Sequence, residues 1–517
     1  MSTHTRLFSR LAILHLCACS GPASDGPEGA TEGSTTSSGC AFECAETGTT
    51  AGEDSTTTAG EDSTTTGEDA TTGDPAPACE ALPGAPPPFA IDGVAHVPLD
   101  LREVAAELVF DAASQEIRGA AVVDFRAGDV VGRPLFDLRQ PITRAVLDGE
   151  ELALAALVRV EPPAEDATMI AVDRLLEPCS EHVLELEYAV EALDTAPSFI
   201  FEPDAITWGT LIFDYPARRL AEKWLPSNLI HDVYDLSVEL VVENAAITHA
   251  LLANAPVAEL GLNHWQVSFA DATAMSPLLQ LCPAGSVLRE GAEVELGDAT
   301  VEVVAWACTN WSNYAPDVAE IVPLVESALQ YGYAELGPYP HGDRFLAVVL
   351  PATGPLSMEY PGATVTHTSD TLHEVFHTWI GRGVRPLTQR DAWFDETWTE
   401  YAADDAYMAE PIDPSGKPVA LAGDNLWVRT FPTAAYTAGP RVLAGLAQAI
   451  GEDELRGLLR EFYAAYTGEA VTTEILERDL HCRIGGDLVR QRFHRFVYGR
   501  TGDAPPAPAG YCEDARI

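Results

Sequence analysis

The stretch from Thr371 to Gly381, TLHEVFHTWIG, constrains the chain more than any other. Its two histidines, His373 and His377, are four residues apart, and side chains at that spacing lie on one face of a helix. Two neighbouring imidazoles with Glu374 between them are typical of a zinc site in which the glutamate stays free to act as a base. By itself the pattern also fits a helix with two surface histidines, so the assignment needs a third ligand.

Glu396 is the candidate for that third ligand. Eighteen residues separate it from His377, and it lies in the segment WFDETWTEY, residues 393–401. A carboxylate on a second helix completes a site of two histidines and one glutamate and leaves a fourth position for water. We therefore predict one Zn²⁺ per chain, held by His373, His377 and Glu396, although another divalent metal could fill the same site.

The N-terminus has the pattern of a bacterial lipoprotein signal peptide over residues 1–18. Arg6 and Arg10 form a basic start, a short apolar core follows, and the segment ends in Leu-Cys-Ala-Cys. This pattern predicts cleavage before Cys19, acylation of its thiol, and a protein exported to the cell envelope. Ser20 after the acylated cysteine favours the outer membrane. The alternative is an ordinary signal peptide that contains cysteines.

Residues 19–82 are expected to be a disordered acidic tether rich in Thr and Gly. No Lys, Arg, Ile, Leu or Val occurs between residues 20 and 81, and the sequence TAGEDSTT is repeated from Thr50 and from Thr58. Such a segment buries too little apolar surface to offset the entropy lost on ordering. We interpret it as a spacer that holds a folded body away from a membrane.

Charge and cysteine content limit the partners and the compartment. The chain of 517 residues carries a formal net charge of -49, which argues against binding to nucleic acid. An even number of cysteines in an exported chain predicts disulfides. Spacing does not fix the pairing; we expect the nearer partners, Cys282 with Cys308 and Cys482 with Cys512. The oligomeric state is left open.

The hydrophobic pattern changes near residue 312. Before it, apolar residues alternate with polar ones, as in Asp235 to Val242, which predicts an antiparallel β domain over residues 83–312, packed as a sandwich or saddle. After it, residues 313–517 have helical spacing around one buried strand, residues 345–350. The fold class is therefore α+β, with a mostly helical catalytic domain and a small sheet. Further helices are expected at about 396–408, 440–450, 452–466 and 473–480.

The histidine and glutamate spacing resembles that of the aminopeptidase N-type gluzincin zinc metallopeptidases. Further segments match in the family's order over about residues 90 to 500: GPYP at 337–340, SMEYPG at 357–362 and YTAG at 436–439. The resemblance implies a thermolysin-like catalytic domain in a short form that lacks the family's large C-terminal helical domain. Two positions depart from the family: Ser357 replaces a glycine and Ala438 replaces a lysine.

The resemblance also implies roles for individual residues. Glu374 would be the general base, and Tyr436 would stabilise the negative charge that develops in the transition state. Glu359 would bind the free α-amine of a peptide; whether Asp214 contributes is left open. Glu400 or Asp395 could orient a zinc-bound imidazole.

The favoured function is an exported, lipid-anchored zinc aminopeptidase that acts on peptides outside the cytoplasm. Two alternatives stay open at this point. One is an endopeptidase or other zinc hydrolase of the same fold. The other is a non-catalytic surface-binding lipoprotein, which would gain no advantage from keeping the base together with all three ligands.

Overall fold

The computed structural model describes residues 82–516, except 165–167, 193–198, 204, 211–220, 312–316, 351–356, 404–409 and 514. The predicted signal peptide, Cys19 and all but the last residue of the tether lie outside the described residues, and so does Asp214. The described residues belong to one compact unit, Asp74–Ile517.

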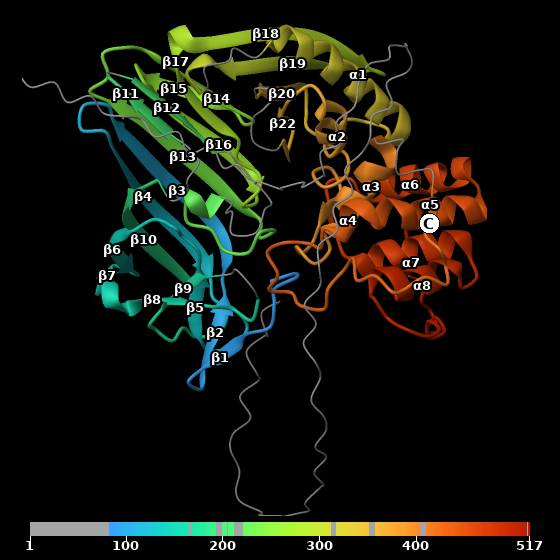
Figure 1. Cartoon of the computed structure of the whole chain (residues 1–517). Helices are drawn as coiled ribbons and strands as arrows, with labels where there is room; N and C mark the ends of the chain where they lie inside the picture. Colours follow the sequence, from blue (N-terminus) through green and yellow to red (C-terminus); the bar gives the residue numbers. More distant parts are fainter. Residues whose placement is uncertain are drawn as a thin grey trace, which may run out of the picture. The chain divides into compact units, whose positions relative to one another are not determined.

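The chain has the predicted α+β class, with strands in its first part and helices concentrated in its second (Figure 1). The largest sheet has eight strands, and alternation of buried and exposed side chains along β13 confirms the predicted period of two. Its strands, in spatial order, are β15 (Val257–Gly261), β16 (His264–Ala272), β13 (Tyr234–Glu243), β3 (Asp100–Asp111), β4 (Glu116–Arg126), β10 (Glu181–Val190), β6 (Ile142–Leu147) and β7 (Glu150–Glu151).

The expectation of purely antiparallel sheets is wrong at the centre of this one. Strands β3 and β13 run parallel, with Leu108 opposite Leu240. Parallel neighbours cannot be joined by a tight hairpin and need a long connection. Here more than a hundred residues separate the two strands, and alternation within each strand carries no information about the direction of its distant neighbour.

Two smaller sheets complete the strand-rich part. One contains β1 (Phe89–Ile91), β2 (Val94–Pro98), β5 (Arg133–Phe136), β9 (Met169–Val172) and β8 (Leu157–Val160). The other contains β11 (Phe199–Glu202), β12 (Ala205–Gly209), β17 (Leu279–Pro283) and β14 (His249–Ala253).

A further sheet, of five strands, crosses the predicted domain boundary at residue 312. Its order is β18 (Val287–Leu296), β19 (Ala299–Cys308), β20 (Arg344–Val349), β22 (Ala363–Thr366) and β21 (Met358–Tyr360). Because β19 pairs in parallel with β20, two strands that precede residue 312 belong to the same sheet as the strands that follow it. The short strands β23 (Arg385–Pro386) and β24 (Ala470–Val471) form a separate pair.

The helices follow the predicted order. They are α1 (Val318–Leu336), α2 (Thr371–Phe376), α3 (Trp393–Ala403), α4 (Ala434–Thr437), α5 (Gly439–Ile450), α6 (Glu452–Tyr466), α7 (Thr473–Ile484) and α8 (Leu488–Arg492). The helix predicted from Glu396 begins three residues earlier, and the last residues predicted for it lie outside the described part. Among the described helices, none is both long and apolar enough to span a membrane.

Burial on both faces explains why β20 is apolar after Arg344. Phe345, Ala347 and Val349 pack into the core shared with the helices. Leu346 and Val348 on the opposite face pack into a second core, with residues such as Met275 from the strand-rich part. A strand covered on both faces has no exposed positions for polar side chains.

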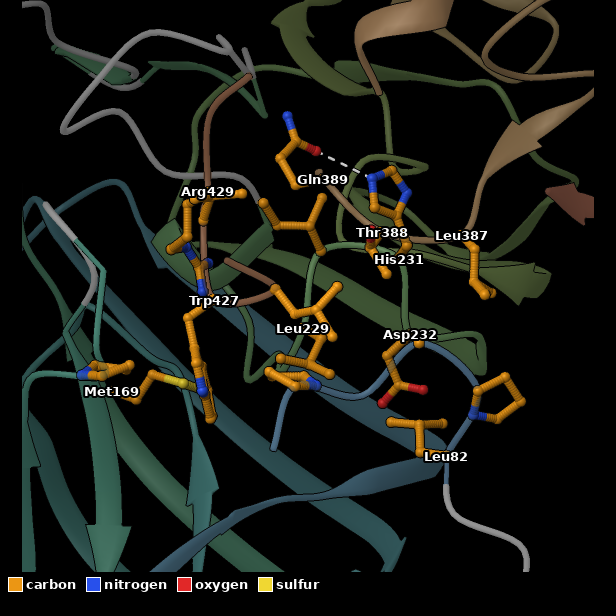
Figure 2. Close-up of a pocket in the computed structure, with 17 residues that line it drawn as sticks. Leu82, Met169, Leu229, His231, Asp232, Leu387, Thr388, Gln389, Trp427 and Arg429 are labelled. Atoms are coloured by element: carbon orange, nitrogen blue, oxygen red, sulfur yellow. Dashed lines mark hydrogen bonds between the residues drawn. The ribbon is translucent and has the colours of Figure 1, made fainter. Parts of the chain in front are cut away.

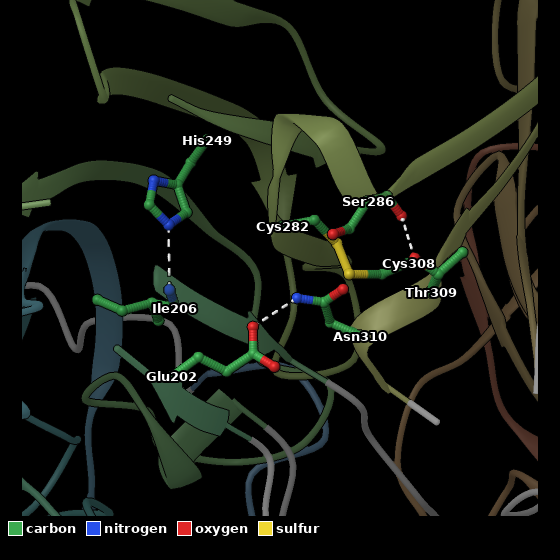
Figure 3. The surroundings of a disulfide bond; sticks show 8 residues. All are labelled: Glu202, Ile206, His249, Cys282, Ser286, Cys308, Thr309 and Asn310. Atoms are coloured by element: carbon green, nitrogen blue, oxygen red, sulfur yellow. Dashed lines mark hydrogen bonds between the residues drawn. A yellow bond between two sulfur atoms is a disulfide. The ribbon is translucent and has the colours of Figure 1, made fainter. Parts of the chain in front are cut away.

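Both predicted disulfides are confirmed. Cys282 in β17 bonds Cys308 in β19 and joins two sheets (Figure 3). Beside it, the Asn310 side chain donates a hydrogen bond to Glu202 at 2.7 Å. Cys482 in α7 bonds Cys512, which fastens the C-terminal residues to that helix.

Polar contacts hold the helical part against the strand-rich part, and Figure 2 shows one of them, between His231 and Gln389, beside a pocket. Arg429 forms ion pairs with Glu222 at 2.6 Å and Asp137 at 3.4 Å. His231 is hydrogen-bonded to the Gln389 side chain at 3.0 Å. Gln389 lies in the segment between α2 and α3, so this contact fixes the connection between the two helices that carry the predicted ligands.

Candidate metal centre

Helix α2 presents its two histidines as the spacing predicted. His377 follows the last helical residue but keeps helical dihedral angles, and its backbone N–H donates to the carbonyl of His373. Val375 and Phe376 are fully buried in the core, which fixes the rotation of this short helix. The opposite face therefore carries His373, Glu374 and His377 together.

Helix α3 brings Glu396 to the two imidazoles. Its Oε2 lies 3.3 Å from Nε2 of His373 and 3.5 Å from Nε2 of His377, and the two nitrogens are 3.0 Å apart. Zinc bonds of about 2.0–2.1 Å at tetrahedral angles place ligand atoms roughly 3.3 Å from one another. The three atoms therefore already stand at the separations that one zinc ion requires.

The chemistry of the donors also fits a cation. Glu396 Oε2 is buried and accepts no hydrogen bond from any described residue. A buried carboxylate oxygen without a partner is costly unless a cation or a donor satisfies it. Burial disfavours the charged form of Glu396, yet the His377 and His373 imidazoles hold its pKa well below the ordinary range.

Asp395 contacts the ring nitrogen of His377 that does not face the other two candidate ligands. Its Oδ1 lies 2.5 Å from Nδ1 of the fully buried His377, and the Thr399 hydroxyl is 3.2 Å from the same nitrogen. A carboxylate on Nδ1 fixes the imidazole so that Nε2 faces the metal. Of the two orienting residues considered from the sequence, Asp395 serves His377, whereas Glu400 lies beside Nδ1 of His373 at 3.7 Å.

Gly381 leaves the space that the Asp395 carboxylate occupies beside His377. It has a φ of 94°, and a Cβ at this position would stand 2.1 Å from both carboxylate oxygens of Asp395. Only glycine adopts this backbone conformation without strain while leaving that space open. The chain can therefore turn directly after α2 and still leave His377 its carboxylate partner.

Glu374 is placed as a base would be. It is 6% exposed, and its Oε2 has no hydrogen-bond partner among the described residues. Burial raises the pKa of its carboxyl to about 8, against the opposing pull of the His373 imidazole. A cation held by the three ligands would lower that pKa and return the carboxylate to the form that accepts a proton.

Tyr436 reaches the same centre from α4. Its hydroxyl donates to Oε1 of Glu396 at 2.9 Å. Gly439 makes this approach possible, because a Cβ there would lie 1.8 Å from the Thr397 hydroxyl on α3. The YTAG segment thus positions its tyrosine through a close contact that only glycine permits.

Glu359 lies near the centre, but it is not free. It lies in β21 and is 4% exposed. One of its carboxylate oxygens lies within 4.8 Å of a ring nitrogen of His377 and of a carboxylate oxygen of Asp395. Arg382 Nη2 is 2.5 Å from its Oε1. We did not predict Arg382 from the sequence, because an arginine just beyond a turn is usually exposed. Thr399 was also missed, although its position three residues after Glu396 on one helix face could have indicated it.

Comparisons with known proteins bear on the fold. No family model matches the sequence, and the search of curated proteins gave no match. The structure resembles an M1 zinc metallopeptidase from Deinococcus radiodurans with a TM-score of 0.55 and 18% identity, over 79% of this chain and 96% of the other. A mutant of that enzyme bound to a Tyr-Ser-Ala substrate gives the same values.

Native yeast LTA4 hydrolase is also similar, with a TM-score of 0.56 and 11% identity, over 80% of this chain and 69% of the other. At such identities the likeness establishes a common fold. The expected α+β class and a fold shared with M1 zinc metallopeptidases are therefore confirmed, and the activity must be argued from the residues of this chain.

Proposed function

We propose that this protein is a zinc-dependent peptidase. The observation that carries the proposal is the convergence of His373, His377 and Glu396 on one point, with Glu374 buried beside them. The neighbours in fold are zinc metallopeptidases, which supports the choice of zinc and of peptide substrates.

The residues divide the chemistry between them. Zinc bound by the three ligands would polarise the scissile carbonyl and lower the pKa of a water molecule. Glu374 takes the proton of the attacking water and delivers it to the leaving amine. The Tyr436 hydroxyl, already directed at the centre, donates a hydrogen bond to the carbonyl oxygen as negative charge develops on it.

Replacing Tyr436 by phenylalanine tests the last of these roles. We expect kcat to fall by roughly 10- to 1,000-fold, because one hydrogen-bond donor to the transition state is lost. KM and zinc content should change little, since the phenyl ring keeps the packing and no ligand is removed. Steady-state kinetics and metal analysis measure both. An unchanged kcat would remove Tyr436 from the mechanism.

Zinc binding is expected to strengthen as pH rises. Burial opposes protonation of His373, but the neighbouring Glu396 carboxylate raises its pKa to about 9 in the metal-free protein. Zinc must therefore displace at least one proton at every pH below about 9, so its affinity should increase by at least about tenfold per pH unit well below that value. The Asp395 carboxylate also raises the pKa of the buried His377, which adds to the dependence. Competition with a chromogenic chelator between pH 6 and 8 measures this slope, and a flat profile would contradict it.

We further propose that the peptidase is an aminopeptidase. Support comes from Glu359, whose carboxylate lies close to the metal centre and could pair with the α-ammonium of a substrate. Such pairing places the scissile bond one residue from the amino end. Free and N-acetylated versions of one peptide, analysed by mass spectrometry, provide the test. Release of single N-terminal residues that drops on acetylation is expected; internal cuts at an unchanged rate would refute aminopeptidase action.

The second candidate is an endopeptidase, and one observation favours it. The Glu359 carboxylate is already paired with Arg382, so a substrate ammonium would not find an uncompensated charge. The same acetylation experiment separates the two candidates, because an endopeptidase has no use for the amine.

Export and anchoring are proposed from the sequence. The signal pattern and Cys19 support a lipoprotein of the cell envelope, with residues 19–82 as its tether. We also propose a saddle-like β domain followed by a thermolysin-like catalytic domain. Replacing Cys19 by serine should move the protein from the membrane fraction to the soluble fraction, and an unchanged distribution would reject lipid anchoring.

A further inference from the structure

Glu359, the candidate for binding the substrate amine, already forms an ion pair with the Arg382 side chain. Arg382 and Glu359 are both nearly fully buried, at 7% and 4% exposure, and their Nη2 and Oε1 atoms are 2.5 Å apart. The other terminal nitrogen of Arg382 donates to the Gly381 carbonyl at 3.1 Å and lies 3.8 Å from Asp395 Oδ2. The guanidinium is therefore fixed between two carboxylates and one carbonyl.

This arrangement leaves Glu359 only partly available. Among the described residues, the hydrogen bond accepted by its carboxylate comes from Arg382 through Oε1, so a substrate ammonium would have to use Oε2. The ammonium and the guanidinium would then share one carboxylate at a separation of about 5 Å. At an effective dielectric constant of about 20, like charges at that distance weaken binding by roughly a hundredfold.

We propose that Arg382 determines how strongly this enzyme distinguishes free from blocked amino ends. It attenuates the charge that Glu359 offers, so the wild-type protein prefers free amines only modestly and tolerates blocked ones. This inference rests on the proposed peptidase function and names a specificity-determining residue of the same site. Arg382 acts through Glu359, the carboxylate with which it is paired.

The test compares an amino-acid anilide with its N-acetyl derivative, which are cleaved at the same bond. The measured quantity is the ratio of kcat/KM for the free substrate to that for the acetylated one, at pH 8. Any general damage to the site lowers both rates and cancels in the ratio. The variants are Arg382→Gln, Arg382→Met, Arg382→Lys and Glu359→Gln. Arg441→Gln, in a half-exposed arginine of α5, is the matched control.

The ratio should rise at least about tenfold in the two neutral variants of Arg382. It should stay near the wild-type value in Arg382→Lys and Arg441→Gln, and it should fall by no more than about tenfold in Glu359→Gln. A ratio that is unchanged or lower in folded, metal-containing Arg382→Gln or Arg382→Met overturns the proposal. If neither neutral variant folds, a hundredfold fall in Glu359→Gln overturns it, because the carboxylate would then be acting at full strength.

Failure of this inference differs from failure of the proposed function. If wild type hydrolyses neither anilide nor peptide, or if Glu374→Gln is as active as wild type, the peptidase itself is refuted. If wild type is active through Glu374 but the ratio does not respond to the charge at position 382, only the role of Arg382 is refuted.

Discussion

Replacement of Glu374 by glutamine is expected to lower kcat/KM for peptide hydrolysis by about 10²- to 10⁴-fold, the range that general acid–base catalysis contributes. Glutamine keeps the shape of the side chain but cannot accept the proton of the attacking water. The ligands are untouched, so zinc should remain at one ion per chain. Rates on anilides and peptides, together with metal analysis of the same samples, measure both effects.

A matched change separates this effect from the loss of a negative charge in general. Glu320→Gln alters an exposed glutamate in the first turn of α1 and should leave both rate and metal content unchanged. Activity of Glu374→Gln within a few-fold of wild type, on every substrate that wild type cleaves, would instead favour a non-catalytic binding protein.

The second large effect is expected when His377 is replaced by alanine. The metal site loses a ligand, and Asp395 loses the partner that its Oδ1 contacts at 2.5 Å. Breaking a buried charged pair from one side typically costs about 3–5 kcal/mol, and Arg382, 3.8 Å from Oδ2 of Asp395, offsets part of that cost here. We therefore expect zinc content below one tenth of an ion per chain, loss of hydrolysis, and a lowered free energy of unfolding.

His367→Ala is the control for this variant. His367 lies just before α2 and pairs with Asp370 at 3.1 Å, but it contacts none of the three ligands. It should keep full zinc content and nearly full stability. Equal behaviour of the two alanine variants in metal analysis and chemical denaturation would show that His377 is an ordinary core histidine.

The grouping of His373, His377 and Glu396 could be predicted because the sequence spacing of the histidines is local. Four-residue spacing on one helix places His373 beside His377, and a carboxylate on the next helix completes the set. The strands could be predicted for the same reason, since alternation reveals the buried face of β13.

Relations between distant segments could not be predicted in this way. The parallel pairing of β3 with β13 depends on how the intervening chain folds, and neither strand encodes it. The Glu359–Arg382 pair joins strand β21 to the turn that follows helix α2. Glu359 was predicted only as an amine-binding residue and Arg382 was not predicted at all, so only the fold shows that the two are buried together. The two-histidine segment therefore defines the chemistry, whereas the contact with Arg382 bears on the choice of substrate.

Zinc titration of the metal-free protein, followed by hydrolysis in the same cuvette, tests the central claim most directly. Hydrolysis should rise in proportion to added zinc and stop rising at one ion per chain, while Glu374→Gln should bind the same single ion without gaining activity. The account would be contradicted if the metal-free protein already hydrolysed peptide at the full rate before zinc is added, or if the wild-type protein failed to bind zinc.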